Sequence, residues 1–312
     1  MELIRGLYNL RQGHAGCVAT IGNFDGVHLG HQAVLGQLAE KSAELNLPSV
    51  VVTFEPQPQE FFARVKIPAR LSRFREKMQA LRRYSVDRVV CLRFNRSLAA
   101  MSAEEFIQKL LVDGLGVCYL VVGDDFRFGH ARQGDFSMLQ AAGREHGFQV
   151  VNMHTFSVDT MRVSSTRIRE ALAQGDFATA EKLLGRPYRM SGRVSHGNKR
   201  GRELGFPTAN IHLHRLVTPL HGIFAVEVFG LEQEPLAAVA SVGTRPTYDG
   251  TQYLLEVHVF DFGRDIYGRY VQIEFLRKLR DELRFDTQDD LRAAIARDCE
   301  QAREFFKNYH AR

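Results

Sequence analysis

The chain has 312 residues, of which 45% are hydrophobic and 25% charged, and its formal net charge at pH 7 is +5. This composition is typical of a soluble protein with two domains, each long enough to bury its own core. No stretch approaches the roughly 18 apolar residues of a membrane-spanning helix, and the N-terminus lacks a signal-peptide core, so we expect a cytoplasmic protein without a membrane partner.

The cysteine and histidine patterns do not predict a metal or disulfide centre. The four cysteines are scattered without a C-x-x-C pair, at Cys17, Cys91, Cys118 and Cys299. They support neither a disulfide framework nor a zinc site. His212, His214 and His221 lack a carboxylate partner in the sequence, and we expect them at the surface rather than on a metal.

The first half of the chain alternates short apolar segments with segments of helical periodicity. The predicted strands are 17–21, 50–54, 88–94, 117–122 and 148–153. The first predicted helix begins at Val27, and the next three cover 72–84, 103–112 and 136–145. This alternation predicts a Rossmann-like α/β domain: a parallel sheet, helices on both faces, and ligands at the carboxyl ends of the strands.

The first strand runs into the segment GNFDGVHLGH, which contains His28 and His31. Their spacing of three places both on one face of the first helical turn, beside free N–H groups and a positive dipole end. Two imidazoles there could stabilise charge on a phosphoryl group during transfer. The alternative is a histidine pair that only decorates the surface or core. No G-x-G-x-x-G is present, which argues against a dinucleotide-binding oxidoreductase.

GNFDGVHLGH resembles the H-x-G-H signature of the nucleotidyltransferase superfamily, and more closely its FMN adenylyltransferase branch. Three further segments agree in order and spacing: TFEP at 53–56, GDDFRFG at 123–129 and RVSSTRIR at 162–169. One departure is Gln57, where the family usually has His after TFEP.

The resemblance implies a site in this half, with His28 and His31 stabilising the transition state. The implied ATP- and phosphate-binding residues are Gly22, Asn23, Asp25, Gly26, Arg162, Ser164, Ser165, Thr166 and Arg169. A plain helix cap is the alternative for the serines, whereas Arg162 and Arg169 suit a triphosphate as forked donors. Asp125, Phe126 and Phe128 are candidates to contact the flavin, with core packing as the alternative for both aromatic rings.

The pattern changes after two short helices at 170–185, where Arg186-Pro187 interrupts the helical periodicity. We therefore expect domains at 1–185 and 186–312. The strands predicted beyond this point are 188–194, 222–229, 236–242, 253–260 and 270–275, and the final predicted helix is 287–309. Strands without intervening helices predict a small antiparallel β-barrel or sandwich, closed by the C-terminal helix.

The segment 192–211, GRVSHGNKRGRELGFPTANI, combines four glycines with several cations. Dense glycine suits a backbone that approaches a ligand closely, and N–H groups near Arg and Lys suit a phosphate. A basic surface loop is the alternative. The segment is not a Walker A loop, because Asn198 stands where the lysine would be.

The second half resembles riboflavin kinase along nearly its whole length. The segment above fits G-x-V-x-H-G-x-x-x-G-R-x-L-G-x-P-T-A-N, and GIFAV, VGTRPTY, LEVHVFDF, YG and FLRKLRDELRF follow. Two departures are Ser241, where Asn is usual, and Phe224, where Tyr is usual.

This resemblance implies that Thr208 and Asn210 hold Mg²⁺ that arrives with ATP, since both offer neutral oxygens. The implied ATP-binding residues are Gly192, His196, Gly197, Gly201, Arg202, Gly205, Pro207, Thr208 and Asn210. Glu256 is implied as the base that takes a proton from the ribityl 5′-hydroxyl as it attacks the γ-phosphate. The alternative for Glu256 is a solvent-facing strand residue.

Together the two halves resemble the bifunctional riboflavin kinase/FAD synthetase family of prokaryotic type. The resemblance implies that ATP phosphorylates riboflavin to FMN and then adenylylates FMN to FAD with release of pyrophosphate. We expect small-molecule substrates, Mg²⁺, and a monomer or weak homo-oligomer. One alternative is a single-activity nucleotidyltransferase with a non-catalytic ligand-binding barrel. Another is a nucleic-acid-binding protein, although the chain has no basic run of five or more.

Overall fold

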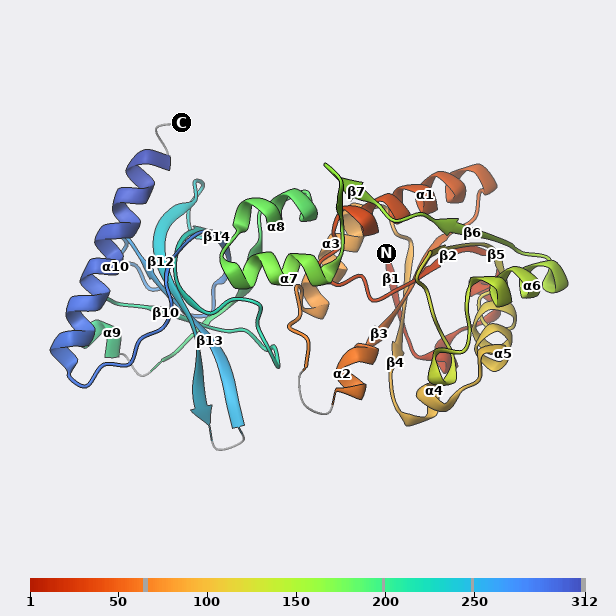
Figure 1. Ribbon diagram of the computed structural model, residues 1–312, viewed down its shortest axis with the longest axis horizontal. Coiled ribbons are helices and arrows are strands. Elements are labelled where there is room, and N and C mark those ends of the chain that lie inside the picture. Colours follow the sequence, from red (N-terminus) through yellow and green to blue (C-terminus); the bar gives the residue numbers. More distant parts are fainter. Residues whose placement is uncertain (64–66, 198–199, 248–249, 310–312) are drawn as a thin grey trace. The chain divides into compact units, whose positions relative to one another are not determined.

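The computed structural model describes residues 1–63, 67–197, 200–247 and 250–309. The chain forms two compact units (Figure 1). The N-terminal unit consists of Met1–Pro68 and Phe74–Ser164, and the C-terminal unit consists of Ala69–Arg73 and Ser165–Arg312. No helix in the described part of the chain is long and apolar enough to cross a membrane.

The described part of the N-terminal unit contains a six-stranded parallel sheet in the order β1-β4-β3-β2-β5-β6. Its strands are β1 (Glu2–Arg5), β2 (Cys17–Ile21), β3 (Ser49–Glu55), β4 (Arg88–Arg93), β5 (Val117–Gly123) and β6 (Gln149–Met153). All five predicted strands are present, and β1 was missed because only Ile4 of its residues is buried. The strand order reverses between β2 and β5, so the loop after β2 lies at a topological switch point, where such sheets bind ligands.

Helices cover both faces of this sheet, as predicted. Leu35 of α1 (Leu29–Leu45) and Leu81 of α3 (Phe74–Arg83) are buried on one face. On the other face lie α5 (Ala103–Phe106), the π-helical η3 (Ile107–Val112) that continues it, and α6 (Phe136–His146). The short remaining elements are η1 (Leu7–Asn9), η2 (Gln12–His14), α2 (Pro58–Phe62), α4 (Arg96–Ala100), η4 (His130–Arg132), β7 (Ser157–Val158) and β8 (Met161–Arg162).

The C-terminal unit contains a closed antiparallel barrel in the order β10-β13-β12-β11-β14-β9. The strands are β9 (Arg189–Ser195), β10 (Ala209–His212), β11 (Gly222–Phe229), β12 (Leu236–Thr247), β13 (Gly250–Val259) and β14 (Tyr270–Arg280). The prediction of a barrel is confirmed, although β10 was missed because it lies inside the glycine-rich segment. A short helix, α9 (Arg200–Glu203), lies in the same segment.

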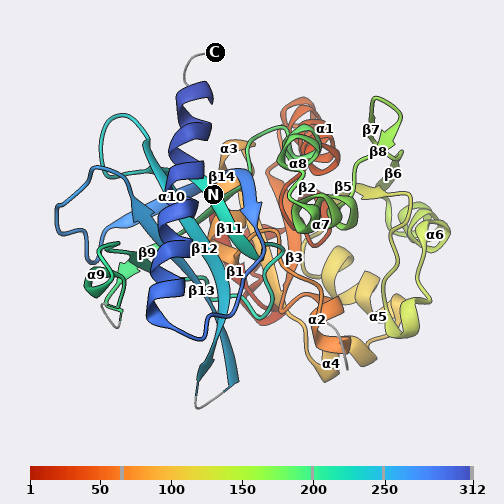
Figure 2. The same cartoon turned by 60° about the vertical axis from the view of Figure 1, so that its left-hand side comes forward.

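The predicted C-terminal helix is α10 (Gln288–Tyr309), which lies along the barrel wall beside β12 (Figure 2). It buries Ala302 and Phe306 against Ala225 and Val239 of the barrel. The Arg280 guanidinium, at the end of β14, donates to both carboxylate oxygens of Asp298 at 2.7 and 2.6 Å, which ties this strand to α10.

The helices before the barrel, α7 (Ser165–Gln174) and α8 (Phe177–Leu184), belong to the C-terminal unit. The Phe177 ring lies 6.0 Å from Phe224 and 6.2 Å from Phe275, two rings of the barrel interior. The compact units thus divide after Ser164 rather than at 185. The boundary between functional domains at 185 stays a prediction.

The same unit also holds Ala69–Arg73, a segment from the first half of the sequence. The buried Arg215 guanidinium donates to the carbonyl oxygens of Arg70 at 2.9 Å and Leu71 at 3.3 Å. The Tyr188 hydroxyl donates to the Leu71 carbonyl at 3.1 Å. These hydrogen bonds attach the segment to the barrel unit.

If α8 is part of the barrel unit, Phe177→Ala should lower the free energy of unfolding of that unit by about 3–5 kcal/mol, as for other buried Phe→Ala changes. Hydrogen exchange of the β11 and β14 amides in increasing urea measures this. The matched control is Leu216→Ala in the same unit, since Leu216 is 67% exposed. An equal, small effect of both substitutions would contradict the assignment.

Candidate active sites

The loop after β2, residues 22–28, has an unusual backbone. Phe24, Gly26 and Val27 have positive φ angles of 49°, 82° and 43°. Such φ values suit glycine but cost a β-branched residue such as Val27 of the order of 1–3 kcal/mol, and strain of this kind clusters at functional sites. Successive N–H groups in a loop of alternating handedness form a concave site for anions. The geometry therefore favours the predicted phosphate role of this loop.

His28 is the N-cap of α1, and its Nδ1 accepts the His31 backbone N–H at 3.3 Å. An accepting Nδ1 carries no proton, so the proton of the neutral His28 ring lies on Nε2. The His28 and His31 rings stack with centroids 3.6 Å apart and an 18° interplanar angle. The prediction that the two rings share one face of the first turn is confirmed.

His31 is held in its neutral form. Burial, then the neighbouring His28 and Lys77, lower its pKa well below its ordinary value. Its Nδ1 is shielded from solvent and has no hydrogen-bond partner among the described residues. A neutral imidazole can donate a hydrogen bond to a phosphoryl oxygen without carrying a charge of its own.

Hydrogen bonds from other elements brace the loop. The Thr53 hydroxyl donates to the Asn23 carbonyl at 3.3 Å, and the Lys77 ammonium donates to Thr53 Oγ1 at 3.3 Å. The Gln32 amide donates to the Val27 carbonyl at 3.0 Å. The predicted ligand Asp25 is 2% exposed, so its side chain lies beneath the loop surface.

The segment 123–129 gives a mixed result for the predicted flavin contacts. Phe126 and Phe128 stack at 5.5 Å, but Phe128 is buried in the core and packs against Phe106 at 5.4 Å. Asp125 forms an exposed ion pair with Arg162 at 3.1 Å, which the sequence did not predict. At the neighbouring residue, the Thr155 hydroxyl donates a hydrogen bond to the Asp124 carboxylate at 2.8 Å, which lowers the pKa of that carboxyl. The flavin role of these residues stays a prediction.

The predicted second phosphate motif lies at a helix start, as expected, because α7 begins at Ser165. Ser164 is the last residue of the N-terminal unit, so the motif spans the division between the units. The Arg169 Nε donates to the Ala69 carbonyl, and both residues belong to the C-terminal unit. The phosphate roles of Ser164, Ser165, Thr166 and Arg169 stay predictions.

An aromatic cluster that the sequence did not predict is formed by Phe54, Phe61, Phe62 and Phe94. These rings lie 5.2–5.9 Å apart at the carboxyl ends of β3 and β4 and on α2. Phe62 is 60% exposed, which is unusual for a large apolar side chain. The three phenylalanines within the segment FEPQPQEFF were the sequence feature that could have predicted this cluster.

In the C-terminal unit, two predicted glycines permit close packing around the T-A-N tripeptide. A Cβ on Gly197 would lie 2.3 Å from Nδ2 of Asn210. A Cβ on Gly201 would lie 2.5 Å from the Phe206 carbonyl and 3.1 Å from Thr208 Oγ1. Any other residue would force the loop away from Thr208 and Asn210.

The barrel register aligns the predicted kinase residues across four strands. Asn210 is paired with Ser195 on one side and with Glu256 on the other, and Glu256 is paired with Ser241. Directly opposite residues on neighbouring strands share one face, so these side chains form a row. The departure at Ser241 therefore adjoins Glu256. The Asn210 Oδ1 atom is buried without a partner among the described residues, as an oxygen held for a ligand would be.

A second carboxylate, Glu282, lies near Glu256 and was not predicted. Its side chain covers Gly243, where a Cβ would meet Oε1 of Glu282 at 2.0 Å. Burial raises the pKa of Glu282, Arg280 opposes this, and the charge of Glu256 raises it further. In sequence Glu282 appears only as one charge within FLRKLRDELRF.

The histidines of this unit lie in different surroundings. The His196 ring lies 3.9 Å from the Tyr267 ring, and the His258 ring nitrogen Nδ1 lies 2.8 Å from the Pro207 carbonyl. His214 and His221 are exposed, as expected, whereas His212 is half-buried. Among the described residues no group of three His, Cys, Asp or Glu side chains could hold a metal ion.

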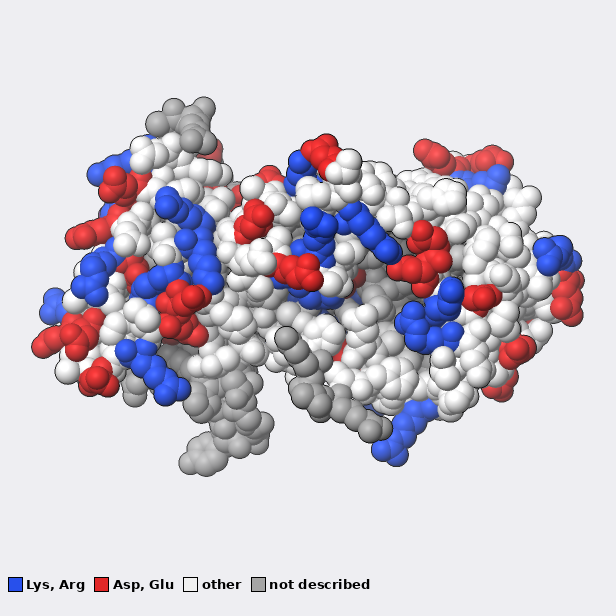
Figure 3. Space-filling model, in the orientation of Figure 1, with Lys and Arg blue, Asp and Glu red and all other residues white. Residues whose placement is uncertain are grey.

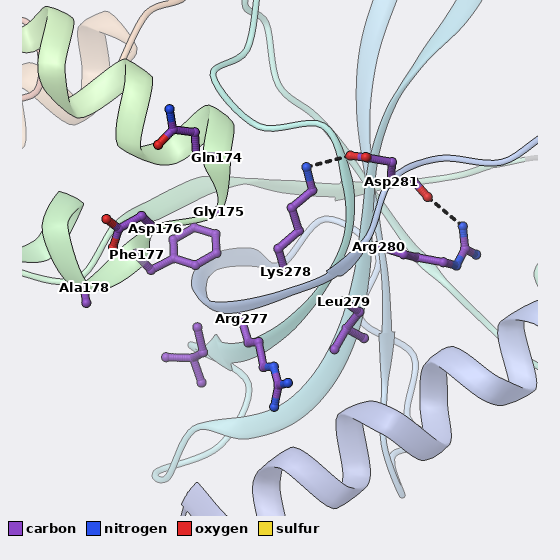
Figure 4. A pocket seen from close by; sticks show the side chains of 11 residues that line it. Gln174, Gly175, Asp176, Phe177, Ala178, Arg277, Lys278, Leu279, Arg280 and Asp281 are labelled. Atoms are coloured by element: carbon purple, nitrogen blue, oxygen red, sulfur yellow. Dashed lines mark hydrogen bonds and ion pairs between the residues drawn. The ribbon is translucent and has the colours of Figure 1, made fainter.

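A pocket of about 560 Å³ lies between the start of α8 and the end of β14 (Figure 4). Two of its three cations form ion pairs within the protein, Lys278 with Asp281 at 2.6 Å and Arg280 with Asp298, and the Arg277 guanidinium lies over the Phe305 ring. None of the predicted site residues lines it.

Comparison with known proteins identifies the family. The FAD synthetase family profile matches residues 10–167, and the riboflavin kinase profile matches residues 184–306. The bifunctional riboflavin kinase/FMN adenylyltransferase of Escherichia coli strain K12 is 53% identical over 307 residues, 98% of both chains. That of Haemophilus influenzae is 52% identical over 99% of this chain and 100% of its own. The chain belongs to this bifunctional family.

The riboflavin kinase is therefore C-terminal and the FMN adenylyltransferase, or FAD synthetase, is N-terminal, which confirms the predicted function. The comparisons do not favour the single-activity or nucleic-acid-binding alternatives. The crystal structure of a macrolide-efflux protein from Streptococcus pneumoniae superimposes with a TM-score of 0.80 and 31% sequence identity, over 97% of this chain and 99% of its own. The two-part fold is shared with that protein.

The lowered pKa of His31 predicts a dependence of stability on pH. An unfolded histidine binds a proton below about pH 6.5, whereas folded His31 does not, so the free energy of unfolding should fall as pH falls through that value. The contribution of His31 should approach ~1.4 kcal/mol per pH unit. Urea unfolding at pH 7.5 and 5.5 should show a smaller loss for His31→Gln than for the unaltered chain. The exposed His146→Gln variant should keep the original loss, and equal losses in all three proteins would contradict this account.

Proposed function

We propose that adenylyl transfer takes place over the loop after β2, and that phosphorylation of riboflavin takes place over the Asn210–Glu256 pair of the barrel. The cap geometry of His28 supports the first assignment, and the shared face of Asn210 and Glu256 supports the second. Both reactions are in-line displacements at phosphorus, which need positioning and charge stabilisation more than covalent catalysis.

In the adenylyltransferase site, the phosphate of FMN attacks the α-phosphorus of ATP and pyrophosphate leaves. The His28 Nε2–H donates to an oxygen of the α-phosphoryl group, where negative charge develops in the transition state. His31 keeps this ring in place by stacking and by its backbone N–H. Asn23 and the N–H groups of residues 22–28 bind the remaining phosphate oxygens.

In the kinase site, Glu256 accepts the proton of the ribityl 5′-hydroxyl while that oxygen attacks the γ-phosphate of ATP. Glu282 places a second carboxylate near this base. The buried Oδ1 of Asn210 and the Thr208 hydroxyl fit the hard oxygen ligands that Mg²⁺ prefers. Mg²⁺ bound there would neutralise charge on the phosphates.

The exposed cluster of Phe61 and Phe62 offers the FMN ring an aromatic face in the adenylyltransferase unit. It lies at the carboxyl end of β3, next to the strand that leads into the His28 loop. Offset stacking on phenylalanine suits the flat isoalloxazine ring. This assignment adds to the predicted contacts of Asp125 and Phe126.

The enzyme is proposed to work in the cytoplasm on small molecules, as a monomer or weak homo-oligomer, and apart from nucleic acids and membranes. The surface charges support the small-molecule assignment. Over the described part of the face shown in Figure 3, basic and acidic residues are interspersed. A nucleic-acid-binding face would instead carry a continuous basic strip.

Two substitutions should separate the activities. Glu256→Gln should lower the rate of FMN formation by about 10²–10⁴-fold, the usual contribution of a general base, while FAD formation from supplied FMN continues. His28→Asn should lower FAD formation about 10²–10³-fold and leave FMN formation intact, because it removes one donor to the developing charge. Product analysis by HPLC with Mg²⁺–ATP measures both. Loss of both activities in either variant would contradict the assignment of one residue to one reaction.

The flavin face is tested by Phe62→Ala, which should raise the KM for FMN in adenylyl transfer by about tenfold through loss of one aromatic contact. Tyr8→Ala, at an exposed ring outside the cluster, is the matched control and should leave this KM unchanged. An unchanged KM for FMN in Phe62→Ala would remove Phe62 from the flavin site.

A further inference from the structure

Lys77 of α3 has no solvent-exposed surface. Lysine is rarely fully buried, because removing an ammonium ion from water costs several kcal/mol even when it gains partners. The neighbouring basic residues of the same helix, Arg82 and Arg83, remain exposed. The burial of this one cation is therefore a specific feature of the N-terminal unit.

The ammonium lies under the proposed ATP-binding loop. It donates at 3.3 Å to the hydroxyl of Thr53, which is also fully buried. That hydroxyl in turn donates at 3.3 Å to the backbone carbonyl of Asn23. This relay ends in the loop whose φ angles are strained at Phe24 and Val27, so Lys77 supports the loop at the point where its backbone is least able to hold its own shape.

Other groups show where the charge acts. Lys77 lowers the pKa of His31 on α1 and, against the effect of burial, that of Cys91 on β4. The charge therefore lies among β3, β4 and the beginning of α1. The first turn of a helix is itself a positive end, so two positive features meet here, and they favour an anion above the loop.

We infer that Lys77 is a positioning residue for adenylyl transfer, which fixes the Asn23 turn through Thr53 and places an ammonium group beneath His31 and the first turn of α1. This inference rests on the proposed ATP site in the loop after β2. Lys77 has no surface with which to touch ATP or FMN, so it acts through Thr53 and through its field. A fixed charge in a site of low dielectric stabilises developing negative charge more than it strengthens substrate binding.

The experiment measures both activities in the full-length protein carrying Lys77→Met, which keeps the side-chain length and removes the charge. We expect kcat for FAD formation to fall at least ~30-fold, with KM for FMN changed less than ~3-fold, because a transition-state interaction is lost. Formation of FMN from riboflavin in the same protein reports on the C-terminal unit and should be unchanged, while the unaltered KM for FMN shows that the N-terminal unit is still folded. Lys77→Arg should retain more of the adenylyltransferase kcat than Lys77→Met, since it keeps the charge.

Thr53→Val tests the relay. It should lower the same kcat less than Lys77→Met does, and the double variant should lose less than the product of the two single losses, because the residues act through one contact. NMR titration should show the pKa of His31 rising in Lys77→Met.

The inference is overturned if Lys77→Met keeps the kcat for FAD formation, if both activities fall together, or if the pKa of His31 does not move. Failure of the underlying site assignment gives a different result, since His28→Asn would then also keep its rate of FAD formation.

Discussion

In the adenylyltransferase unit, the hydrogen bond from the His31 amide to His28 Nδ1 both caps helix α1 and orients the His28 ring. As an N-cap it satisfies one of the free N–H groups at the start of α1. Because Nδ1 accepts this bond, the proton of a neutral His28 ring lies on Nε2, the atom proposed to face the α-phosphoryl group. The same cap fixes where the strained loop of residues 22–28 ends. The loop in turn has its shape because Thr53 and Gln32 bind its carbonyl oxygens.

In the kinase unit, strand register rather than a helix cap positions the proposed site residues. Pairing of β10 with β13 sets Asn210 opposite Glu256, and a one-residue slip would move both side chains to the other face. Gly197 lies against Asn210, and Gly201 lies against Phe206 and Thr208, where a Cβ would not fit. Phe224, where the family usually has Tyr, is fully buried beside Phe177 and Phe275, away from the Asn210–Glu256 row.

The sequence was most informative where structure follows from local pattern. Buried parallel strands are continuous apolar runs, so β2 to β5 could be placed to within a few residues, as could the edge strand β6 and the helices between the strands. Strand β1 could not be predicted in this way, because only one of its four residues is buried and the strand therefore contains no apolar run. The burial of Lys77 and the approach of Glu282 to Glu256 depend on tertiary packing. Nothing in the local sequence distinguishes these residues from exposed charges, and the same is true of Ala69–Arg73, which leaves its own half to join the barrel unit.

The central claim is that each half of the chain completes one step by itself and that FMN links them. Mixing the His28→Asn and Glu256→Gln variants with riboflavin, ATP and Mg²⁺ tests it most directly. The account predicts FMN first and then FAD after a lag, although neither variant alone converts riboflavin to FAD at an appreciable rate. A mixture that accumulates FMN and makes no FAD would contradict the account.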